Sequence, residues 1–154
     1  MPHDLSFKLY PVGETPDDVD TLIYEVLYRD WDVPLEPVER WYNREQGGRF
    51  VVMRDAKDGT LLGVCRLMPA GTEDPTRVQV RQVVVNPASR GGGLGRCLME
   101  KAAEVAAAEG VTEFWLDARE QAWPFYEKLG YHYTSEVWLS KLTAIPHRTM
   151  SKTL

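Results

Sequence analysis

The chain has 154 residues, of which 44% are hydrophobic and 27% are charged, a composition that is ordinary for one globular domain. Its formal net charge of −5 argues against binding of nucleic acid by bulk electrostatics and slightly favours a cationic partner. Two cysteines are too few for a disulfide framework, and three scattered histidines show no metal-ligand spacing, so we expect no metal.

The first half of the chain carries strand and helix patterns in turn. A short strand is predicted over residues 7–10 and an amphipathic helix over 16–30, because apolar residues recur there at helical spacing. A second, shorter helix is predicted over 36–44 and ends at a pair of glycines. Strands over 49–54 and 60–68 follow, and the Asp-Gly pair between them signals a hairpin.

The second half continues with strands predicted over 76–85, 113–117, 131–135 and 137–150, and with helices over 93–109 and 121–129. A strand, a helix and a further strand form a right-handed crossover, so the strands ending at Val85 and Asp117 are expected to be adjacent and parallel. The ligand crevice of such a sheet lies at the carboxyl ends of its strands. No linker or repeat divides the chain, and we expect a single α/β domain over residues 1–154.

The apolar runs and the first residues bear on where the protein is located. No run approaches the roughly 18 residues of a membrane span, and the first residues lack the basic and apolar regions of a signal peptide. We therefore expect a cytoplasmic protein that binds neither membranes nor nucleic acid.

A glycine-dense turn, Asn86-Pro-Ala-Ser-Arg-Gly-Gly-Gly-Leu-Gly-Arg96, joins a valine-rich strand to a predicted helix. Glycines let the main chain approach a ligand closely, and the first N–H groups of a helix have no partner inside it. These donors, the helix dipole and the side chains of Arg90 and Arg96 predict a seat for a phosphate or pyrophosphate. The spacing excludes a P-loop, which needs a lysine after its glycine, and a dinucleotide fingerprint, whose third glycine is missing.

Several motifs together point to one family. Arg90-x-x-Gly93-x-Gly95 resembles the signature of the GCN5-related N-acetyltransferases (GNAT), in which this loop holds the pyrophosphate of acetyl-CoA. The stretch Ala122-Trp-Pro-Phe-Tyr-Glu-Lys-Leu-Gly-Tyr131 is similar to the second signature of that family. Arg81-Gln82, Leu116-Asp-Ala-Arg119 and Ile145-Pro-His147 resemble more specifically its ElaA/YjcF-like branch of predicted N-acyltransferases.

The resemblance covers roughly residues 49–135, and the branch-level motifs extend it to about 150. It implies the GNAT fold, a mixed central β-sheet with splayed parallel strands flanked by helices, and acetyl-CoA as acyl-donor co-substrate. The pantetheine arm would bond the main chain of the first splayed strand, with a tyrosine near the sulfur. The cofactor-binding residues that it implies are Val83, Val84, Val85, Arg90, Gly91, Gly92, Gly93, Leu94, Gly95, Arg96, Arg119, Ala122 and Phe125.

The reaction expected from the resemblance is N-acetylation of a primary amine by direct attack in a ternary complex. A backbone N–H near Val83 would meet the oxyanion, and Tyr126 would protonate the leaving thiolate as the catalytic residue. Ala122, Phe125 and Leu129 are expected to pack, with Tyr126 one position round the helix from them. The alternative role for Tyr126 is that of an anchoring core residue.

The base that deprotonates the acceptor ammonium stays open among Glu25, Asp117, His147 and a relay of water. Proline cannot donate to a ladder, so Pro146 is expected at an edge or irregularity of the last strand, which would aim His147 toward the crevice. The alternative is that His147 ties down the last strand through a backbone hydrogen bond.

The acceptor is expected to be a small molecule rather than a protein. The sequence leaves several alternatives for the residues that line its pocket. Arg66 could bind an acceptor carboxylate or be a solvated strand residue, and Arg119 stands where many family members have Asn. An aromatic face typical of a core, a dimer contact or a substrate wall is made by Tyr24, Tyr28, Trp31, Trp41 and Tyr42.

The alternative function is a non-catalytic acyl-CoA-binding module on the same fold, acting as a sensor or partner-binding domain. The sequence does not fix the oligomeric state, and a homodimer is one of the possible assemblies.

Overall fold

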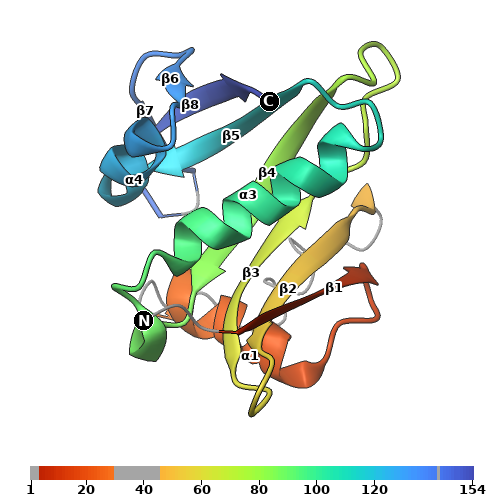
Figure 1. Cartoon of the computed structure of the whole chain (residues 1–154). Coiled ribbons are helices and arrows are strands. Elements are labelled where there is room, and N and C mark those ends of the chain that lie inside the picture. The colour runs from red at the N-terminus through yellow and green to blue at the C-terminus, as the bar shows by residue number, and fades with distance from the viewer. Residues whose placement is uncertain (1–3, 30–45, 142) are drawn as a thin grey trace.

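The computed structural model describes residues 4–29, 46–141 and 143–154 (Figure 1). Within these ranges the helices are α1 (Asp17–Leu27), α3 (Leu94–Ala107) and α4 (Trp123–Lys128), with 3-10 turns η3 (Pro87–Ser89) and η4 (Glu120–Ala122). The strands are β1 (Leu5–Pro11), β2 (Arg49–Asp55), β3 (Leu61–Leu67), β4 (Arg77–Val85), β5 (Glu113–Arg119), β6 (His132–Tyr133), β7 (Trp138–Leu139) and β8 (Pro146–Thr153). The helix predicted over 36–44 lies outside the described residues.

The described strands form one mixed sheet in the order β1-β2-β3-β4-β5-β8-β6, and β7 also pairs with β8. Strands β4 and β5 are parallel, whereas the other described pairs are antiparallel. The α/β fold with a mixed sheet is confirmed, and so is the parallel pair expected from the crossover through α3.

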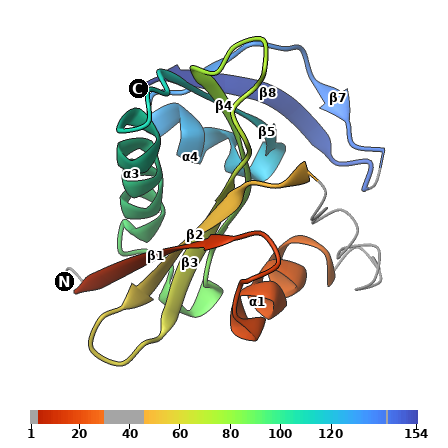
Figure 2. The same cartoon turned by 90° about the vertical axis from the view of Figure 1, so that its right-hand side faces the viewer.

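Helices cover both faces of this sheet, with α3 on one face and α1 on the other (Figure 2). The alternation of side chains along β2 divides the core between them. Val51 and Met53 pack in the cluster that contains α3, whereas Phe50 and Val52 pack with α1. Because β2 and β3 are covered on both faces, both strands read as nearly continuous apolar runs.

The parallel strands separate along their length. Pairs between β4 and β5 are confined to Arg77–Gln79 on one strand and Glu113–Trp115 on the other. Beyond these residues, β4 continues to Val85 and β5 to Arg119 without further pairs between them. The carboxyl ends of the two strands are therefore splayed.

A β-bulge in β4 lies where the strands separate. The register between β3 and β4 shifts between Val64 and Arg66, so that Gln82 and Val83 both lie opposite Cys65. Gln82 adopts a positive φ of 43°, which residues other than glycine rarely adopt. Since an extra residue on one strand bends that strand, the bulge accounts for the divergence of β4 from β5.

The strand predicted over 137–150 is wrong as a single strand. The chain forms β7, turns back on itself and enters β8 at Pro146. In the turn, the Ser140 N–H donates to the carbonyl of Ile145 at 3.0 Å, and Ala144 has a positive φ of 58°. Pro146 is the first residue of β8, which fits its expected place at an irregularity because the position requires no ladder donor.

Candidate active site

A cavity of about 1180 Å³ opens where β4 and β5 diverge. Its lining comes from the glycine-rich turn, α3, α4 and the end of α1, and from the strands β4, β5, β7 and the start of β8. All the predicted site residues line this cavity except Val84 and Gly92. The Val84 side chain is buried against α1, so any contact of this residue with a ligand would have to be made by its main chain.

The glycine-rich turn leaves the N-terminus of α3 open. Gly93 is the residue before the helix, with a φ of 73°, and no side chain caps the helix there. Gly91 also has a positive φ, of 98°, and a Cβ on Gly91 or Gly93 would meet no atom within 4 Å. Both glycines therefore serve backbone conformation and openness rather than packing, and the first N–H groups of α3 stay available to an anion.

Gly95 differs from these two glycines. A Cβ at this position would lie 2.8 Å from the Phe125 ring, which is closer than real contacts allow. Gly95 therefore lets α3 and α4 pack closely against each other. Phe125 is only partly buried, and it lines the cavity beside this contact.

Three cationic side chains of the cavity lining surround the open helix end. Arg90 is exposed, and the described residues offer it no ion pair or hydrogen bond. Arg96 lies 3.8 Å from Glu100 in an exposed pair one helical turn away, and such a pair contributes little because water screens it. Lys128 also lines the cavity from the end of α4. The charge of this end of the cavity suits a phosphate ligand.

Tyr126 is the buried residue of α4, with 6% of its surface exposed. Its ring packs edge-on against Phe125 at 5.0 Å and against Tyr131 at 5.4 Å between centroids. Burial raises the pKa of the Tyr126 phenol well above its usual range, and Tyr131 and Cys65 raise it further. The phenol therefore stays protonated at neutral pH, so it can donate a hydrogen bond into the cavity that it lines but cannot act as a base.

The packing expected for α4 needs a correction. Leu129 is buried as predicted, but Ala122 and Phe125 are only partly buried, and Tyr126 is the side chain that enters the core. The reason is tertiary. The hydrophobic side of this short helix faces both the core and the cavity, and the sequence cannot tell which apolar residue meets which.

Arg119 ends β5 and contacts α1. Its guanidinium donates to the carbonyl of Leu27 at 2.7 Å, at the C-terminus of that helix, where a cation is favoured by the dipole. Burial lowers the pKa of Arg119, although a guanidinium of this kind stays charged at neutral pH. Arg119 also lines the cavity, and its contact with the cofactor stays a prediction. Its hydrogen bond to α1 is a structural role that the sequence did not indicate.

The three candidate bases lie in different places. Glu25 lines a second cavity of about 740 Å³ beside α1 and forms an exposed pair with Arg29 at 3.8 Å. Asp117 and His147 line the cavity between the splayed strands. Asp117 is exposed and accepts a hydrogen bond from the Thr149 hydroxyl at 2.7 Å.

His147 both faces the cavity and bonds the main chain. Its Nδ1 lies 2.9 Å from the carbonyl oxygen of Ile145, and its ring stacks on Trp138 with centroids 4.8 Å apart and an interplanar angle of 24°. The prediction that His147 turns toward the crevice is confirmed, and the backbone hydrogen bond of the alternative interpretation is present as well.

Both interpretations offered for Arg66 are wrong. Its side chain is fully buried, donates to the carbonyl of Gly47 through Nε at 3.2 Å and Nη2 at 2.6 Å, and lies over the Phe50 ring. It does not line the cavity between the splayed strands. The guanidinium instead holds the chain that leads into β2 against β3. An arginine in an otherwise apolar strand covered on both faces was the available signal, because such a residue must be buried with hydrogen-bond partners.

Of the aromatic residues proposed for an acceptor wall, Tyr28 lines the cavity and Tyr24 does not. Trp31, Trp41 and Tyr42 lie outside the described residues. Trp138 and Gln82 are among the wall residues that sequence reasoning missed. Trp138 lies in a segment that was predicted as continuous strand, and Gln82 lies at the bulge, which the sequence did not indicate. Within the described residues, the Gln82 Oε1 is buried and has no hydrogen-bond partner, which is rare in native proteins.

No group of three or more His, Cys, Asp or Glu residues in the described ranges is arranged to hold a metal ion. No helix in those ranges is both long and apolar enough to cross a bilayer.

The fold and site thus define an α/β protein in which a cavity between two splayed parallel strands reaches an open helix N-terminus. Residues 17–131 match the model of the acetyltransferase (GNAT) family. The chain belongs to this family.

Relatives and solved structures agree with this assignment. The glucosamine 6-phosphate N-acetyltransferase of Trypanosoma brucei brucei is 38% identical over 76 residues, which are 47% of this chain and 52% of that protein. The chain thus matches about half the length of that relative. The uncharacterized N-acetyltransferase YjcF of Bacillus subtilis is 29% identical over 128 residues, 83% of this chain and 85% of YjcF. The crystal structure of Escherichia coli ElaA has the same fold, with a TM-score of 0.73 and 20% identity over 96% of this chain and 99% of ElaA. Similarity to the ElaA/YjcF-like branch is confirmed.

Proposed function

We propose that this protein is an N-acetyltransferase that transfers the acetyl group of acetyl-CoA to a primary amine by direct attack in a ternary complex. The observation that carries the proposal is the continuity of one cavity. It runs from the open, uncapped N-terminus of α3 to the phenol of Tyr126 and on to the α1 side of the sheet. A donor and an acceptor can therefore meet between the splayed strands.

The donor end follows from main-chain chemistry. The pyrophosphate of acetyl-CoA would accept hydrogen bonds from the turn and first helical turn over residues 91–96, with Arg90 and Arg96 beside it. Along β4, the residues after Gln79 have no partner on β5, so their main-chain groups can pair with the amides of the pantetheine arm as an added strand does. Val83 and Val85 line the cavity in this part of the strand.

The chemical step needs a neutral amine, stabilisation of the oxyanion and a proton for the leaving sulfur. The neutral amine attacks the thioester carbonyl carbon, a C–N bond forms, and the oxygen takes on negative charge that a backbone N–H near Val83 would meet. The C–S bond then breaks and the sulfur leaves. Because the phenol of Tyr126 has a raised pKa, a lasting phenolate is costly there. Tyr126 would therefore donate its proton to the sulfur as it regains one from the positively charged nitrogen of the intermediate, which leaves the amide and the free thiol.

Two measurements test this function. Calorimetry with acetyl-CoA reports whether the donor binds, and thiol release against a panel of polyamines, amino acids, aminoglycosides and arylamines reports turnover. Binding together with acetylation of an amine supports the enzyme. Tight binding of acetyl-CoA with no amine acetylated across the panel would instead support a non-catalytic acyl-CoA-binding module, and failure to bind acetyl-CoA would overturn both.

A further inference from the structure

The ring nitrogens of His147 are not equivalent. Nδ1 lies 2.9 Å from the Ile145 carbonyl oxygen, and because a carbonyl can only accept, Nδ1 must carry the hydrogen in the neutral ring. The lone pair is then on Nε2. Among the described residues, Nε2 has no hydrogen-bond partner. It is also not one of the buried side-chain atoms that lack a partner, so Nε2 is not itself buried. The Nδ1 hydrogen bond thus makes Nε2 the accepting nitrogen of a residue that lines the cavity.

The surroundings of His147 hold the ring in one place. Its backbone is paired on one side with Arg119 of β5 and on the other with Trp138 of β7. The Trp138 ring stacks on the imidazole at 4.8 Å, and Pro146 restricts the backbone just before it. A base must be held within reach of its proton, and a side chain fixed by two strands, a stack and a hydrogen bond meets that requirement.

The other candidate bases are less well placed. Glu25 lines a different cavity, and Asp117 is exposed to solvent with its carboxylate bonded to Thr149. The titratable and charged groups around His147 come from every wall of the cavity. They are Arg119 and Asp117 on β5, Arg81 on β4, Tyr28 on α1 and Tyr126 on α4, while Arg148, next along β8, bonds Ser135.

We propose that Nε2 of His147 is the base that prepares the acceptor. In this step, which rests on the proposed function, the ammonium group of the acceptor gives one proton to Nε2 and becomes the neutral amine that attacks the thioester. The imidazolium formed keeps its Nδ1 hydrogen bond to Ile145 and later loses the proton to water through the open cavity.

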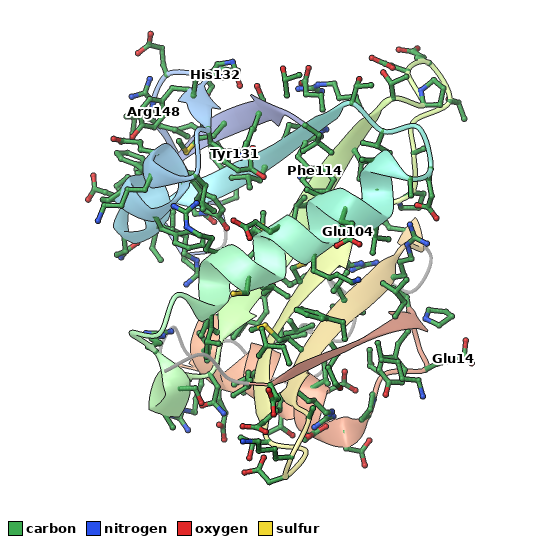
Figure 3. The ribbon with its side chains drawn as sticks, in the orientation of Figure 1. Glu14, Glu104, Phe114, Tyr131, His132 and Arg148 are labelled. Carbon is green, nitrogen blue, oxygen red and sulfur yellow. The ribbon has the colours of Figure 1, made fainter. Side chains whose placement is uncertain are left out.

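The kinetic test uses the two described histidines as a matched pair. His132 is exposed in β6, where its Nε2 lies 3.3 Å from the Ser151 hydroxyl, and it does not line the cavity (Figure 3). With the amine that the panel identifies, the wild type should lose kcat/KM along an acidic limb of its pH profile, because a protonated Nε2 cannot take the proton of the acceptor. His147→Gln should lower kcat/KM at pH 7.5 by about 100-fold and remove this acidic limb. His132→Gln should keep the wild-type kcat/KM and the acidic limb.

A second measurement needs no acceptor. Long-range ¹⁵N–¹H NMR of the wild-type protein should show one histidine with Nδ1 protonated in its neutral form, assigned to His147 because its signals vanish in His147→Gln. An Nε2-protonated ring would overturn the proposal. So would an active His147→Gln enzyme that keeps the acidic limb. A protein that binds acetyl-CoA and acetylates no amine would instead overturn the proposed function, and the role of His147 with it.

Discussion

The turn before α3 and the turn before β8 line one cavity by different physical means. The first offers main-chain N–H groups, and Gly91 and Gly93 hold it open at positive φ with no side chain in the way. The second offers side chains, Trp138 and His147, whose placement depends on pairing with β5 and on each other. A site made of backbone is sensitive to an added Cβ, whereas a site made of side chains is sensitive to the loss of one functional group.

The largest expected effect concerns Tyr126, which lines the same cavity as both turns. Tyr126→Phe removes the hydroxyl that we propose protonates the leaving sulfur, and kcat should fall by about 10 to 1000-fold while the Kd for acetyl-CoA changes little. Steady-state kinetics and calorimetry measure the two quantities. Tyr131→Phe is the matched control, since this buried ring lies 5.4 Å from Tyr126 but does not line the cavity. Parental turnover in Tyr126→Phe would leave Tyr126 a core residue only.

Adding a side chain to the backbone seat tests the first region. Gly93→Val should weaken acetyl-CoA binding by about 30 to 100-fold, because branched methyl groups block the approach to the helix N-terminus. Valine at positive φ also strains the backbone, so Gly59→Val serves as the control. Gly59 has a φ of 77° against 73° for Gly93, both have open space around a Cβ, and Gly59 lies in the β2–β3 hairpin. Equal acetyl-CoA affinity in the two folded variants would contradict an anion seat.

Gly95 allows packing and ligand approach to be separated. Gly95→Ala should lower the free energy of unfolding by about 1 to 3 kcal/mol, because the new Cβ overlaps the Phe125 ring. Thermal and denaturant unfolding measure it. Gly92→Ala is the control, since its Cβ would come no closer than 4.0 Å to another atom and its φ is not positive. If both variants unfold alike, the close contact of α3 with α4 does not depend on this glycine.

The smallest effect concerns how α1 is attached. Asp18 on α1 pairs with Arg54 on β2 at 2.7 Å, and this hydrogen bond lowers the pKa of Asp18. A carboxyl whose pKa is lowered by folding stabilises the protein above its unfolded pKa, about 3.9, and loses that contribution as the pH falls through the folded pKa. Because Asp18 is half exposed, Asp18→Asn should cost less than about 1 kcal/mol at pH 7 and almost nothing near pH 2. A pH-independent change in Tm would contradict this origin.

Local signals in the sequence predicted several elements well. The hairpin at Gly59, the glycine-rich turn and the helix that follows this turn depend on residues close together in the chain, and the structure has all three. Prediction was poorest over residues 137–150, where one long strand was expected and a two-residue strand, a turn and a second strand were found. That turn depends on which side of β8 is paired with β5, and no local pattern reports the pairing of distant strands.

The family, the α/β class and the glycine-rich turn before a helix could all be read from the amino-acid sequence, because glycine spacing, helix periodicity and the strand–turn–helix order are local properties. Three further features depend on the tertiary structure. These are the bulge that separates β4 from β5, the burial of Arg66 away from the cavity and the entry of Tyr126 into the core. The tertiary structure also brings His147 to the cavity wall, where it is the strand partner of Arg119 on β5. Each of these depends on contacts between residues far apart in the chain, whose free energies are set by packing in three dimensions rather than by neighbours in sequence.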